Sequence, residues 1–455
     1  MRSGLWLARF RAATFTGLAA LTAAIFPMAG FGKANRAGPA SDSPPVRDPD
    51  WPFDHPVRTQ GPIHPGRPAA DDGTAAMADL GLAYAGQSVL ITGAGGSIGS
   101  ELCRQVLAAC PARLVMLDTS EAALNDAVRH LPADTGVIPV LGSVADRPLI
   151  AHLLKRHEVS VILHAAAYKH VHLVEANARA GILNNTLGTA VLVAAAREAG
   201  VARFVLVSTD KAVRPSGVMG ASKRLAELIV QDCAARPSGT TFSTVRFGNV
   251  FGSSGSVAPV FAEQIARGGP VTLTDPQATR YFMSVTDAVR LVLTAGSTAR
   301  GGETFLIDMG APVAIRDLAV AMIRTAGKTL RDAANPRGDI DLVVTGLRPG
   351  ERLHETVTSA TATLPSRVPG ILQVVEPGVS EIGVAGLLRD LRALAEGGDD
   401  AAMRAFVLTW LATHDGVPGP AIAACVRPAA LPCRTTGNGQ RAAAGMADTA
   451  RGAAR

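Results

Sequence analysis

The sequence has 455 residues and a formal net charge of +6. Hydrophobic residues make up 47% of it and aromatic residues 4%, and 47 residues are glycine. This length allows about two or three domains, or one large domain with extensions, and the composition suits an Ala-, Val-, Leu- and Gly-rich α/β core rather than a chain disordered throughout. The lysines and arginines are scattered and form no block that could follow a phosphate backbone, so we expect no nucleic-acid partner.

The N-terminal part contains a long uncharged run. Arginines precede it, and no charged residue occurs from Ala12 to Gly32. Its length fits a membrane span of about 20 residues, whereas the rival interpretation, a secretory signal peptide, lacks a clear A-x-A cleavage site. We therefore expect residues 1–32 to form an apolar segment, and we leave open whether residues 12–32 associate with a membrane, as a spanning helix or as an interfacial anchor.

Composition also separates a linker, a folded body and a tail. Residues 33–78 are rich in Pro, Asp, Gly and Arg without a hydrophobic period, which is typical of a linker. Residues 416–455 are rich in Ala, Gly, Arg and Thr, and we expect them to be disordered. Between them we expect a main domain over residues 79–250 and a smaller C-terminal lobe over residues 251–415, with some strands of the lobe returning to the core.

In the folded body, apolar strand-like runs alternate with helical patterns. This alternation predicts βαβ units around a parallel sheet. The predicted helices include Ile98–Ala109, Asn185–Ala199 and Met219–Ala234. The predicted strands are Ser88–Thr92, Arg113–Asp118, Val137–Leu141, Val159–Ala165, Arg203–Thr209 and Phe242–Arg246.

The first predicted strand runs directly into a glycine-rich turn and a helix. Gly93, Gly96 and Gly99 give the spacing G-x-x-G-x-x-G, with Ser97 and Ile98 at the start of the helix. Such a turn lets the backbone approach a pyrophosphate, which the free N–H groups and the positive dipole end of the helix then bind. The expected fold is therefore α/β, with a Rossmann-like doubly wound parallel sheet and a smaller C-terminal substrate-binding lobe.

Residues at the ends of other strands extend this predicted cofactor site. Asp118 ends the second strand, about 20 residues beyond the glycines, where a carboxylate accepts hydrogen bonds from the adenosine ribose and repels a 2′-phosphate. No arginine is adjacent to it, which favours NAD, with NADP as the alternative. Ala165 and Ala166 are small enough for a flat cofactor to lie against their backbone, and Ser143 follows the third strand.

A metal site is not expected. The five cysteines are odd in number and none pairs as C-x-x-C, so neither a zinc site nor a disulfide framework is indicated. His164, His170 and His172 lack a fixed helical spacing and a neighbouring Cys or carboxylate cluster.

The predicted chemical site follows the fifth strand. Thr209, Asp210 and Lys211 place a hydroxyl, a carboxyl and an amine at the carboxyl edge of the sheet, where ligands bind in open α/β folds. Met219 and Lys223 are four residues apart in the next predicted helix and therefore lie on one face of it.

Seven motifs in this order resemble the CapD-like polysaccharide-biosynthesis group of UDP-sugar 4,6-dehydratases, within the extended short-chain dehydrogenase/reductase superfamily. They cover roughly residues 80 to 360. The motifs are TGAGGSIGSEL (92–102), HAAAYKHV (164–171), NNTLGT (184–189), STDKAVRPSGVMGASK (208–223), VRFGNVFGSSGSV (245–257), TRYFM (279–283) and RPGERLHE (348–355).

The resemblance implies a UDP-N-acetylhexosamine, such as UDP-N-acetylglucosamine, as the substrate. The sugar is oxidised at C4, water leaves across C5–C6, and a hydride carried by NAD returns to C6. By similarity, Lys211 removes the C5 proton, and a depressed pKa would suit that role. Asp210 protonates the departing hydroxyl, Thr209 binds the C4 oxygen and Lys223 positions the nicotinamide ribose.

One position departs from the superfamily's usual catalytic set. Met219 occupies the place of the usual tyrosine, and a thioether cannot ionise. Some family members have Met at this position, so the change indicates a subgroup. The base for the C4 hydroxyl stays open between Asp210 and a bound water.

The same resemblance assigns a substrate side to the site. Arginines suit bidentate contacts with a diphosphate, and asparagine can bind phosphate or uracil. The expected substrate-binding residues are Lys169, Asn185, Arg246, Asn249, Arg280, Arg348 and Glu351. Ser143, Gly217 and His172 depart from the common family pattern, and we expect Gly217 to loosen the loop that carries the chemical site.

Two other classes of function remain open. A related NAD-dependent epimerase or dehydrogenase would leave the mass of the product unchanged or would accumulate NADH, and a non-catalytic nucleotide-binding protein would bind the cofactor without turnover. We expect a cytoplasmic catalytic domain, with attachment to the inner face of the cell membrane left open, and a homo-oligomer.

Overall fold

The computed structural model describes residues 83–132, 135–358 and 362–414. The predicted apolar segment 1–32, the linker 33–78 and the tail 416–455 lie outside these residues. Within the described part of the chain, no helix is both long and apolar enough to cross a membrane.

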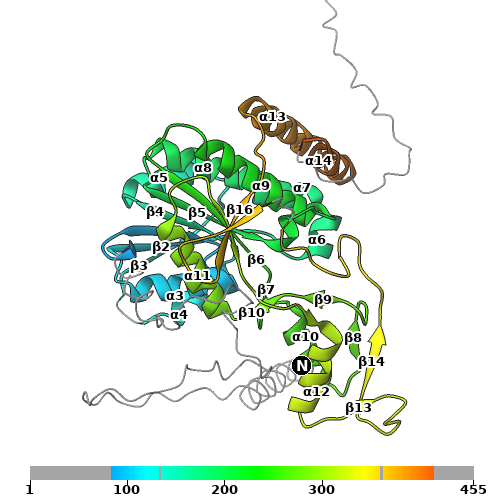
Figure 1. Cartoon of the computed structure of the whole chain (residues 1–455). Helices are drawn as coiled ribbons and strands as arrows, with labels where there is room; N and C mark the ends of the chain where they lie inside the picture. Colours follow the sequence, from blue (N-terminus) through cyan, green and yellow to red (C-terminus); the bar gives the residue numbers. More distant parts are fainter. Residues whose placement is uncertain (1–82, 133–134, 359–361, 415–455) are drawn as a thin grey trace, which may run out of the picture. The chain divides into compact units, whose positions relative to one another are not determined.

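The centre of the described part is a nine-stranded sheet, shown in Figure 1. Its strands run in the order β15-β16-β11-β6-β5-β4-β1-β2-β3. All neighbours from β3 to β11 are parallel, and β16 and β15 pair antiparallel at the far edge. The bounds are β1 Ser88–Thr92, β2 Arg113–Asp118, β3 Val137–Leu141, β4 Val161–His164, β5 Arg203–Thr209, β6 Thr241–Phe247, β11 Thr304–Ile307, β15 Ala362–Pro365 and β16 Ile371–Val375.

Helices cover both faces of this sheet because successive side chains of a strand point to opposite faces. In β1, Val89 and Ile91 pack into one apolar cluster and Leu90 packs into the other. The helices of the first cluster are α3 Ser97–Ala108, α4 Glu121–Arg129 and α11 Val285–Thr298, and those of the second are α5 Arg147–Arg156, α8 Gly188–Glu198 and α9 Val218–Ala234. The predicted Rossmann-like doubly wound fold is confirmed.

The predicted strands and helices agree closely with the structure, with one helix start as the main difference. The sequence pattern places that start at Asn185, but helical structure begins earlier, in α7 Ala178–Gly181. It continues through the π-helical turn η1 Ile182–Leu187 into α8. In the π-helical turn the Asn185 amide reaches the backbone of Tyr168.

A smaller lobe follows β6 and has its own apolar cluster, which contains Phe261, Leu273, Leu318 and Ile340. Its elements are α10 Val257–Ala266, β8 Val271–Leu273, α12 Ile315–Thr325, β13 Leu330–Arg331 and β14 Ile340–Val344. Short strand pairs join residues near it: β7 Asn249–Val250 with β10 Phe282–Met283, and β9 Thr279–Arg280 with β12 Val313–Ala314.

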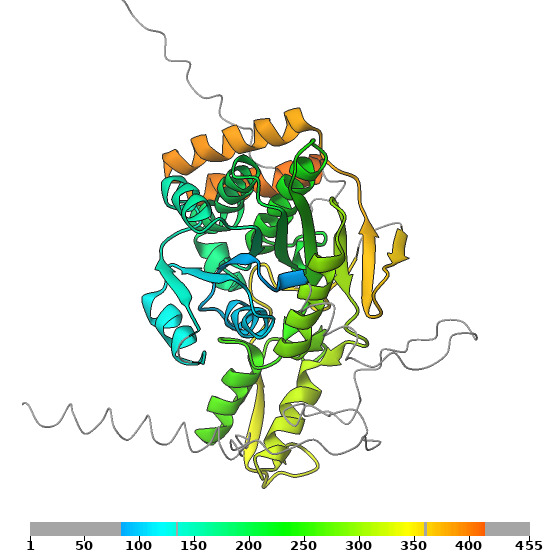
Figure 2. The same cartoon turned by 90° about the vertical axis from the view of Figure 1, so that its left-hand side faces the viewer.

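Much of the chain beyond residue 251 lies against the main sheet. Helix α11 and strands β11, β15 and β16 belong to it. The helices α13 Glu381–Gly397 and α14 Asp400–His414 pack across α7 and α9, as Figure 2 shows. Their shared apolar cluster includes Leu391, Val407 and Leu411. The short helices α6 Val171–Ala176 and η2 Asp210–Ala212 carry residues of the candidate site.

Candidate active site

The glycine turn after β1 forms a tight cradle at the carboxyl edge of the sheet. Gly93 has φ +68°, and a Cβ atom there would come within 2.7 Å of the Ala166 backbone. At Gly99 a Cβ atom would lie 1.9 Å from the Gly93 carbonyl oxygen. Side chains are therefore excluded at both positions, and the turn packs closely against the Ala166 backbone and against the start of α3.

Asp118 lies beside this turn. Its Oδ2 atom accepts a hydrogen bond from the Gly95 N–H at 2.9 Å, and its Oδ1 atom accepts one from the Ser120 N–H at 2.8 Å. The glycine spacing alone did not single out Gly95. This position also requires glycine, because a Cβ atom there would come within 2.6 Å of the Ala123 backbone.

The other predicted cofactor residues surround the same edge. Gly96 precedes α3, Ser97 Oγ accepts a hydrogen bond from the Ser254 N–H at 3.1 Å, and Ile98 packs against the sheet cluster. Ala165 and Ala166 directly follow β4, and Ser143 follows β3. These residues fit a dinucleotide. Only glycine and alanine directly follow the neighbouring strands β1 and β4, and the N-terminus of helix α3 follows the glycine turn.

His164 lies under the cradle and is not exposed. Its Nδ1 atom is 2.7 Å from the Thr92 hydroxyl, and its Nε2 atom is 2.9 Å from the Thr189 hydroxyl. Burial, with a smaller contribution from the charge of Lys223, lowers the pKa of His164 to about 3. The histidine is thus a neutral bridge between β1, β4 and α8.

The acid–base group follows β5. Thr209 Oγ1 donates to Asp210 Oδ1 at 2.9 Å, and Lys211 Nζ donates to the same oxygen at 3.0 Å. Lys211 Nζ also donates to Asn249 Oδ1 at 2.9 Å. The Asp210 side chain is 0% exposed and that of Lys211 is 21% exposed, so the hydroxyl, the carboxylate and the ammonium are held in one chain of contacts.

The charge state of Lys211 differs from the sequence-based expectation. Burial alone would lower its pKa, but the carboxylates of Asp210 and Glu355 outweigh burial and raise the pKa above its ordinary value. The expected depression of this pKa is therefore wrong. In the resting site Lys211 is a paired ammonium.

Glu355 is a site residue that we did not single out from the sequence, although the RPGERLHE motif contains it. Its Oε1 atom lies 3.4 Å from Lys211 Nζ and 3.5 Å from Arg280 Nε. Arg280 in turn donates to the backbone carbonyls of Thr279, Arg352 and Leu353. Arg280 therefore fixes the 352–355 segment, and its engaged guanidinium does not support the predicted diphosphate contact.

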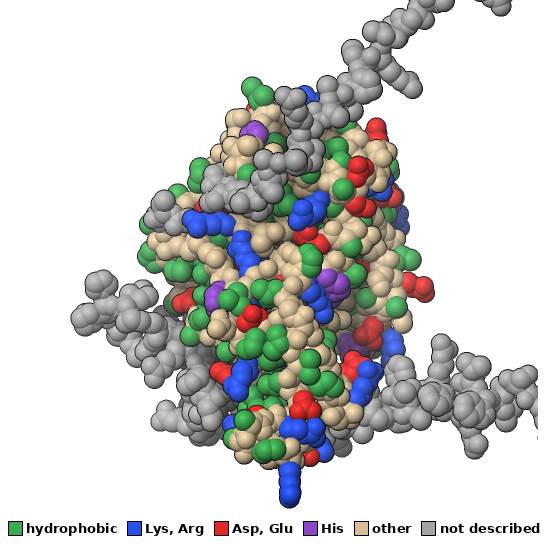
Figure 3. All heavy atoms as spheres, turned by 90° about the vertical axis from the view of Figure 1, so that its right-hand side faces the viewer, with side chains coloured by type: hydrophobic (Ala, Val, Ile, Leu, Met, Phe, Trp, Pro, Cys, Tyr) green, Lys and Arg blue, Asp and Glu red, His purple; other side chains and the backbone are tan. Residues whose placement is uncertain are grey.

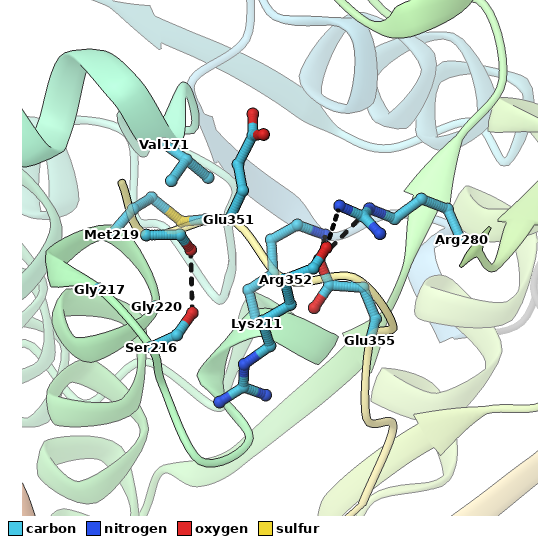
Figure 4. Close-up of a pocket in the computed structure, with 11 residues that line it drawn as sticks. Val171, Lys211, Ser216, Gly217, Met219, Gly220, Arg280, Glu351, Arg352 and Glu355 are labelled. Carbon is cyan, nitrogen blue, oxygen red and sulfur yellow. Dashed lines mark hydrogen bonds and ion pairs between the residues drawn. The ribbon is translucent and has the colours of Figure 1, made fainter. Parts of the chain in front are cut away.

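A pocket lies between these groups and the start of α9 (Figure 4). Charges of both signs face it, and the side chain of Met219 contributes an apolar wall in place of a phenol. The lining residues are Val171, Lys211, Ser216, Gly217, Met219, Gly220, Arg280, Gly350, Glu351, Arg352 and Glu355.

One turn further along α9, Lys223 is 5% exposed. Its Nζ atom donates to the Val207 carbonyl of β5 at 2.7 Å. Burial lowers the pKa of Lys223 to about 8, against the smaller opposing effect of Glu227. The lysine thus joins α9 to the strand that carries the acid–base group.

The surroundings of Arg246 and Asn185 do not agree with the prediction that these residues bind substrate. Arg246 is completely buried, and its guanidinium is bound by the carboxylates of Glu227 and Glu376. Asn185 is also completely buried and binds the Tyr168 backbone and the Ser222 hydroxyl. Neither side chain has a polar atom left to face a diphosphate, so we no longer place them in the substrate site.

Gly217 is a third correction, because it does not loosen its loop. A Cβ atom there would lie 2.0 Å from Glu175 Oε1 and 2.9 Å from Gly350 Cα. The Glu175 carboxylate accepts a hydrogen bond from the Val218 N–H at the start of α9, and Arg404 of α14 binds its other oxygen at 3.0 Å. The missing side chain makes room for this carboxylate.

Two further predicted substrate residues are not among those that line this pocket. Arg348 is exposed, its N–H donates to Glu351 Oε2 at 3.2 Å, and Lys169 is exposed between β4 and α6. On the face drawn in Figure 3, charged side chains of both signs are interspersed with apolar ones.

The fold and the site together define a Rossmann-type protein of the short-chain dehydrogenase/reductase kind, with an acid–base group at the edge of its sheet. The chain belongs to the polysaccharide biosynthesis protein family, whose sequence profile matches residues 89–375. The resemblance stated from the motifs is thereby confirmed.

Three relatives illustrate this similarity. The capsular polysaccharide biosynthesis protein CapD of Staphylococcus aureus is 44% identical over 296 residues, which are 64% of this chain and 48% of CapD. The UDP-N-acetylglucosamine 4,6-dehydratase (inverting) of Campylobacter jejuni is 30% identical over 280 residues, which are 61% of this chain and 79% of the relative.

The third relative is a solved structure, the dTDP-glucose 4,6-dehydratase DesIV of Streptomyces venezuelae with NAD bound. It aligns with a TM-score of 0.54 and 26% identity over 67% of this chain and 96% of DesIV. The present chain spans about half the length of CapD, with 48% of that protein covered.

Proposed function

We propose that this protein is an NAD-dependent nucleotide-sugar 4,6-dehydratase that acts on a UDP-N-acetylhexosamine, with UDP-N-acetylglucosamine as the first candidate, in polysaccharide biosynthesis. The observation that carries the proposal is the contact chain Thr209–Asp210–Lys211 at the edge of the sheet. Simple oxidation or epimerisation has no need of an extra acid–base pair, whereas removal of water across C5–C6 needs both an acid and a base. The name of the Campylobacter relative supports the substrate.

The cradle of Gly93, Gly99 and Asp118 fits NAD as the resident cofactor. When bound, NAD supplies hydride acceptance from C4 and hydride return to C6. The chain's own contribution is to hold it: the start of α3 offers N–H groups to the pyrophosphate, and Asp118 offers a carboxylate to the adenosine ribose. Lys223 adds a positive field beside the sheet edge.

The contact between Thr209 and Asp210 also suggests a base for the C4 hydroxyl, which Met219 cannot supply. Thr209 donates its proton to Asp210 Oδ1 at 2.9 Å, so a C4 hydroxyl bound to Thr209 could pass its proton through the threonine to Asp210. Asp210 would then deliver that proton to the C6 hydroxyl, which leaves as water. One carboxylate serves both steps, and the proton balance closes.

Lys211 is the proposed group at C5. It takes the C5 proton when the hydroxyl leaves C6, and it returns a proton to C5 when hydride arrives at C6. An ammonium cannot accept a proton, so Lys211 must first lose the proton that its two carboxylate neighbours stabilise.

The full chain should be incubated with UDP-N-acetylglucosamine and NAD⁺, and the product mass measured. Loss of one water is expected. The Lys211→Ala variant should lose the dehydration by about 10²–10⁴-fold and keep its NAD affinity, because among the described residues the polar contacts of the Lys211 side chain are with Asp210, Asn249 and Glu355 and not with the glycine cradle.

Other products would contradict the proposal. A product of unchanged mass would indicate an epimerase, and net accumulation of NADH would indicate a dehydrogenase. Tight NAD binding without any turnover of UDP-hexosamines would indicate a non-catalytic nucleotide-binding protein.

A further inference from the structure

Three oxygen atoms lie around the ammonium of Lys211, two in hydrogen bonds and one in an ion pair. They are Asp210 Oδ1 at 3.0 Å, Asn249 Oδ1 at 2.9 Å and Glu355 Oε1 at 3.4 Å. A lysine ammonium has three donors and no lone pair. To act as a base, Lys211 first has to lose one proton, and these three oxygen atoms are the protein acceptors that lie beside it.

Two of the three neighbours are unsuitable. The amide oxygen of Asn249 accepts a hydrogen bond but does not hold a proton near neutral pH. Asp210 keeps one oxygen, Oδ2, without a hydrogen-bond partner among the described residues, but in the proposed reaction it already carries the proton destined for the C6 hydroxyl. Glu355 is the neighbour that is left.

Glu355 is held in place for such a transfer. Its side chain is 5% exposed, and Arg280 Nε lies 3.5 Å from the same oxygen that faces Lys211. Three backbone carbonyls hold the Arg280 guanidinium. The cation beside Glu355 is therefore fixed in position. In the resting site the Glu355 side chain lies beside both cations, Arg280 and Lys211.

A bound sugar changes this balance. It covers the pocket that Lys211 and Glu355 line and removes the water that screens their charges. Removing water from a charged pair is costly, whereas a neutral amine beside a neutral carboxyl avoids most of that cost. Closure of the pocket therefore favours transfer of one proton from the lysine to the glutamate.

We infer that Glu355 is the proton acceptor that converts Lys211 from an ammonium into a free amine when the sugar binds. The inference rests on the proposed dehydratase function. The Nζ–H bond breaks and an Oε–H bond forms, the free amine then takes the C5 proton, and both groups return to their starting states when C5 is reprotonated. Glu355 acts through Lys211 and is therefore a positioning residue.

The test is the pH dependence of dehydration by the native protein and by Glu355→Gln, measured from pH 6 to pH 9.5 as loss of water from UDP-N-acetylglucosamine.

The groups that can affect this pH dependence are those in contact with the two residues. Asp210, Asn249 and Glu355 contact Lys211, and Lys211 and Arg280 contact Glu355. Arg352, which lines the same pocket, is bound to the Val213 carbonyl, and the ring of His354 is bound to the Thr279 hydroxyl.

In the native protein the transfer is internal, so the rate should be nearly constant over this range. In Glu355→Gln the lysine has to lose its proton to solvent. The rate should be lower by about 100-fold at pH 7 and rise by about tenfold per pH unit toward the ordinary pKa of a lysine. KM and NAD affinity should stay unchanged, and Glu355→Asp should recover the flat profile.

Asp341→Asn is the matched control, because Asp341 forms an exposed ion pair with Arg331 at 2.9 Å in the small lobe. It should have the native profile. An equal loss in Glu355→Gln at every pH would indicate a purely structural role and overturn the inference, as would activity at or above the native level. A native protein that removes no water would overturn the proposed function itself, and the inference with it.

Discussion

Arg246 on β6 and Glu227 on α9 form a two-bond ion pair in the interior of the protein. The Nε–Oε1 distance is 2.7 Å, the Nη2–Oε2 distance is 2.5 Å, and the two side chains are 0% and 2% exposed. Glu376, just after β16, binds the same guanidinium at 2.8 and 2.7 Å. The arginine expected to bind substrate instead joins β6, α9 and the end of β16.

Replacement of Arg246 by Met should therefore destabilise the fold. Two buried carboxylates would lose one of their two cations and keep only Arg224, which binds both of them, and breaking a buried pair costs about 3–5 kcal/mol. Denaturant unfolding of the native protein and the variant measures the difference. Arg331→Met is the control, because its exposed pair with Asp341 should contribute at most about 1 kcal/mol. Equal effects of the two variants would contradict the structural role of Arg246.

The same cluster predicts how stability depends on acid. Burial would raise the pKa of Glu227, but the adjacent Arg246 outweighs it and, helped by Arg224 and Ser208, lowers the pKa to about 2 from 4.5. A carboxyl group whose pKa is lowered by folding stabilises the folded state above its unfolded pKa. That stabilisation is lost as the pH falls from about 4.5 toward about 2.

Thermal unfolding between pH 6 and pH 3 measures this loss. The native protein should lose stability steeply below about pH 4.5, and Glu227→Gln, which starts less stable, should show a shallower decline over the same range. Parallel curves for the two proteins would show that Glu227 does not carry the effect.

The glycine cradle gives a prediction about NAD affinity. Gly93→Ala adds a methyl group within 2.7 Å of the Ala166 backbone at a residue with φ +68°. We expect a destabilisation of about 1–3 kcal/mol from the strained backbone, together with a loss of NAD binding of at least about tenfold, measured by calorimetry.

Gly86 provides a matched control for this prediction. It has the same φ of +68°, but nothing lies within 4 Å of its Cβ position. Gly86→Ala should share the backbone strain and keep the NAD affinity. If both variants bind NAD equally well, the close approach of Gly93 to Ala166 does not shape the cofactor site.

Thr209→Val tests the proposed path of the C4 proton. The variant keeps the shape of the side chain and removes the hydroxyl that donates to Asp210. The first oxidation, followed as NADH absorbance in a single turnover, should slow by about 10²–10³-fold with NAD affinity unchanged. Thr209→Ser should restore most of the rate, and a fast Thr209→Val variant would favour a bound water as the relay.

Local patterns in the sequence were sufficient for the elements and for the cofactor side. The first six strands were predicted closely because each is an apolar run bounded by turn residues, as is typical of a parallel sheet. The cradle was predictable because Gly93, Gly99 and Asp118 act through backbone geometry next to their own strands. The sequence also predicted that the side chains of Thr209, Asp210 and Lys211 lie together, because these residues are neighbours in the chain.

Tertiary structure decided which charges meet. Arg246 and Glu376 are separated by 130 residues, and nothing local distinguishes an arginine that binds a carboxylate from one that binds a diphosphate. Asn185, Gly217 and Glu355 were misjudged or missed for the same reason. The sequence by itself predicted the Rossmann fold, the glycine cradle and the position of Thr209, Asp210 and Lys211 after β5, and only folding determined that Lys211 is a paired ammonium. The pKa of a buried side chain depends on partners that other strands and loops bring to it.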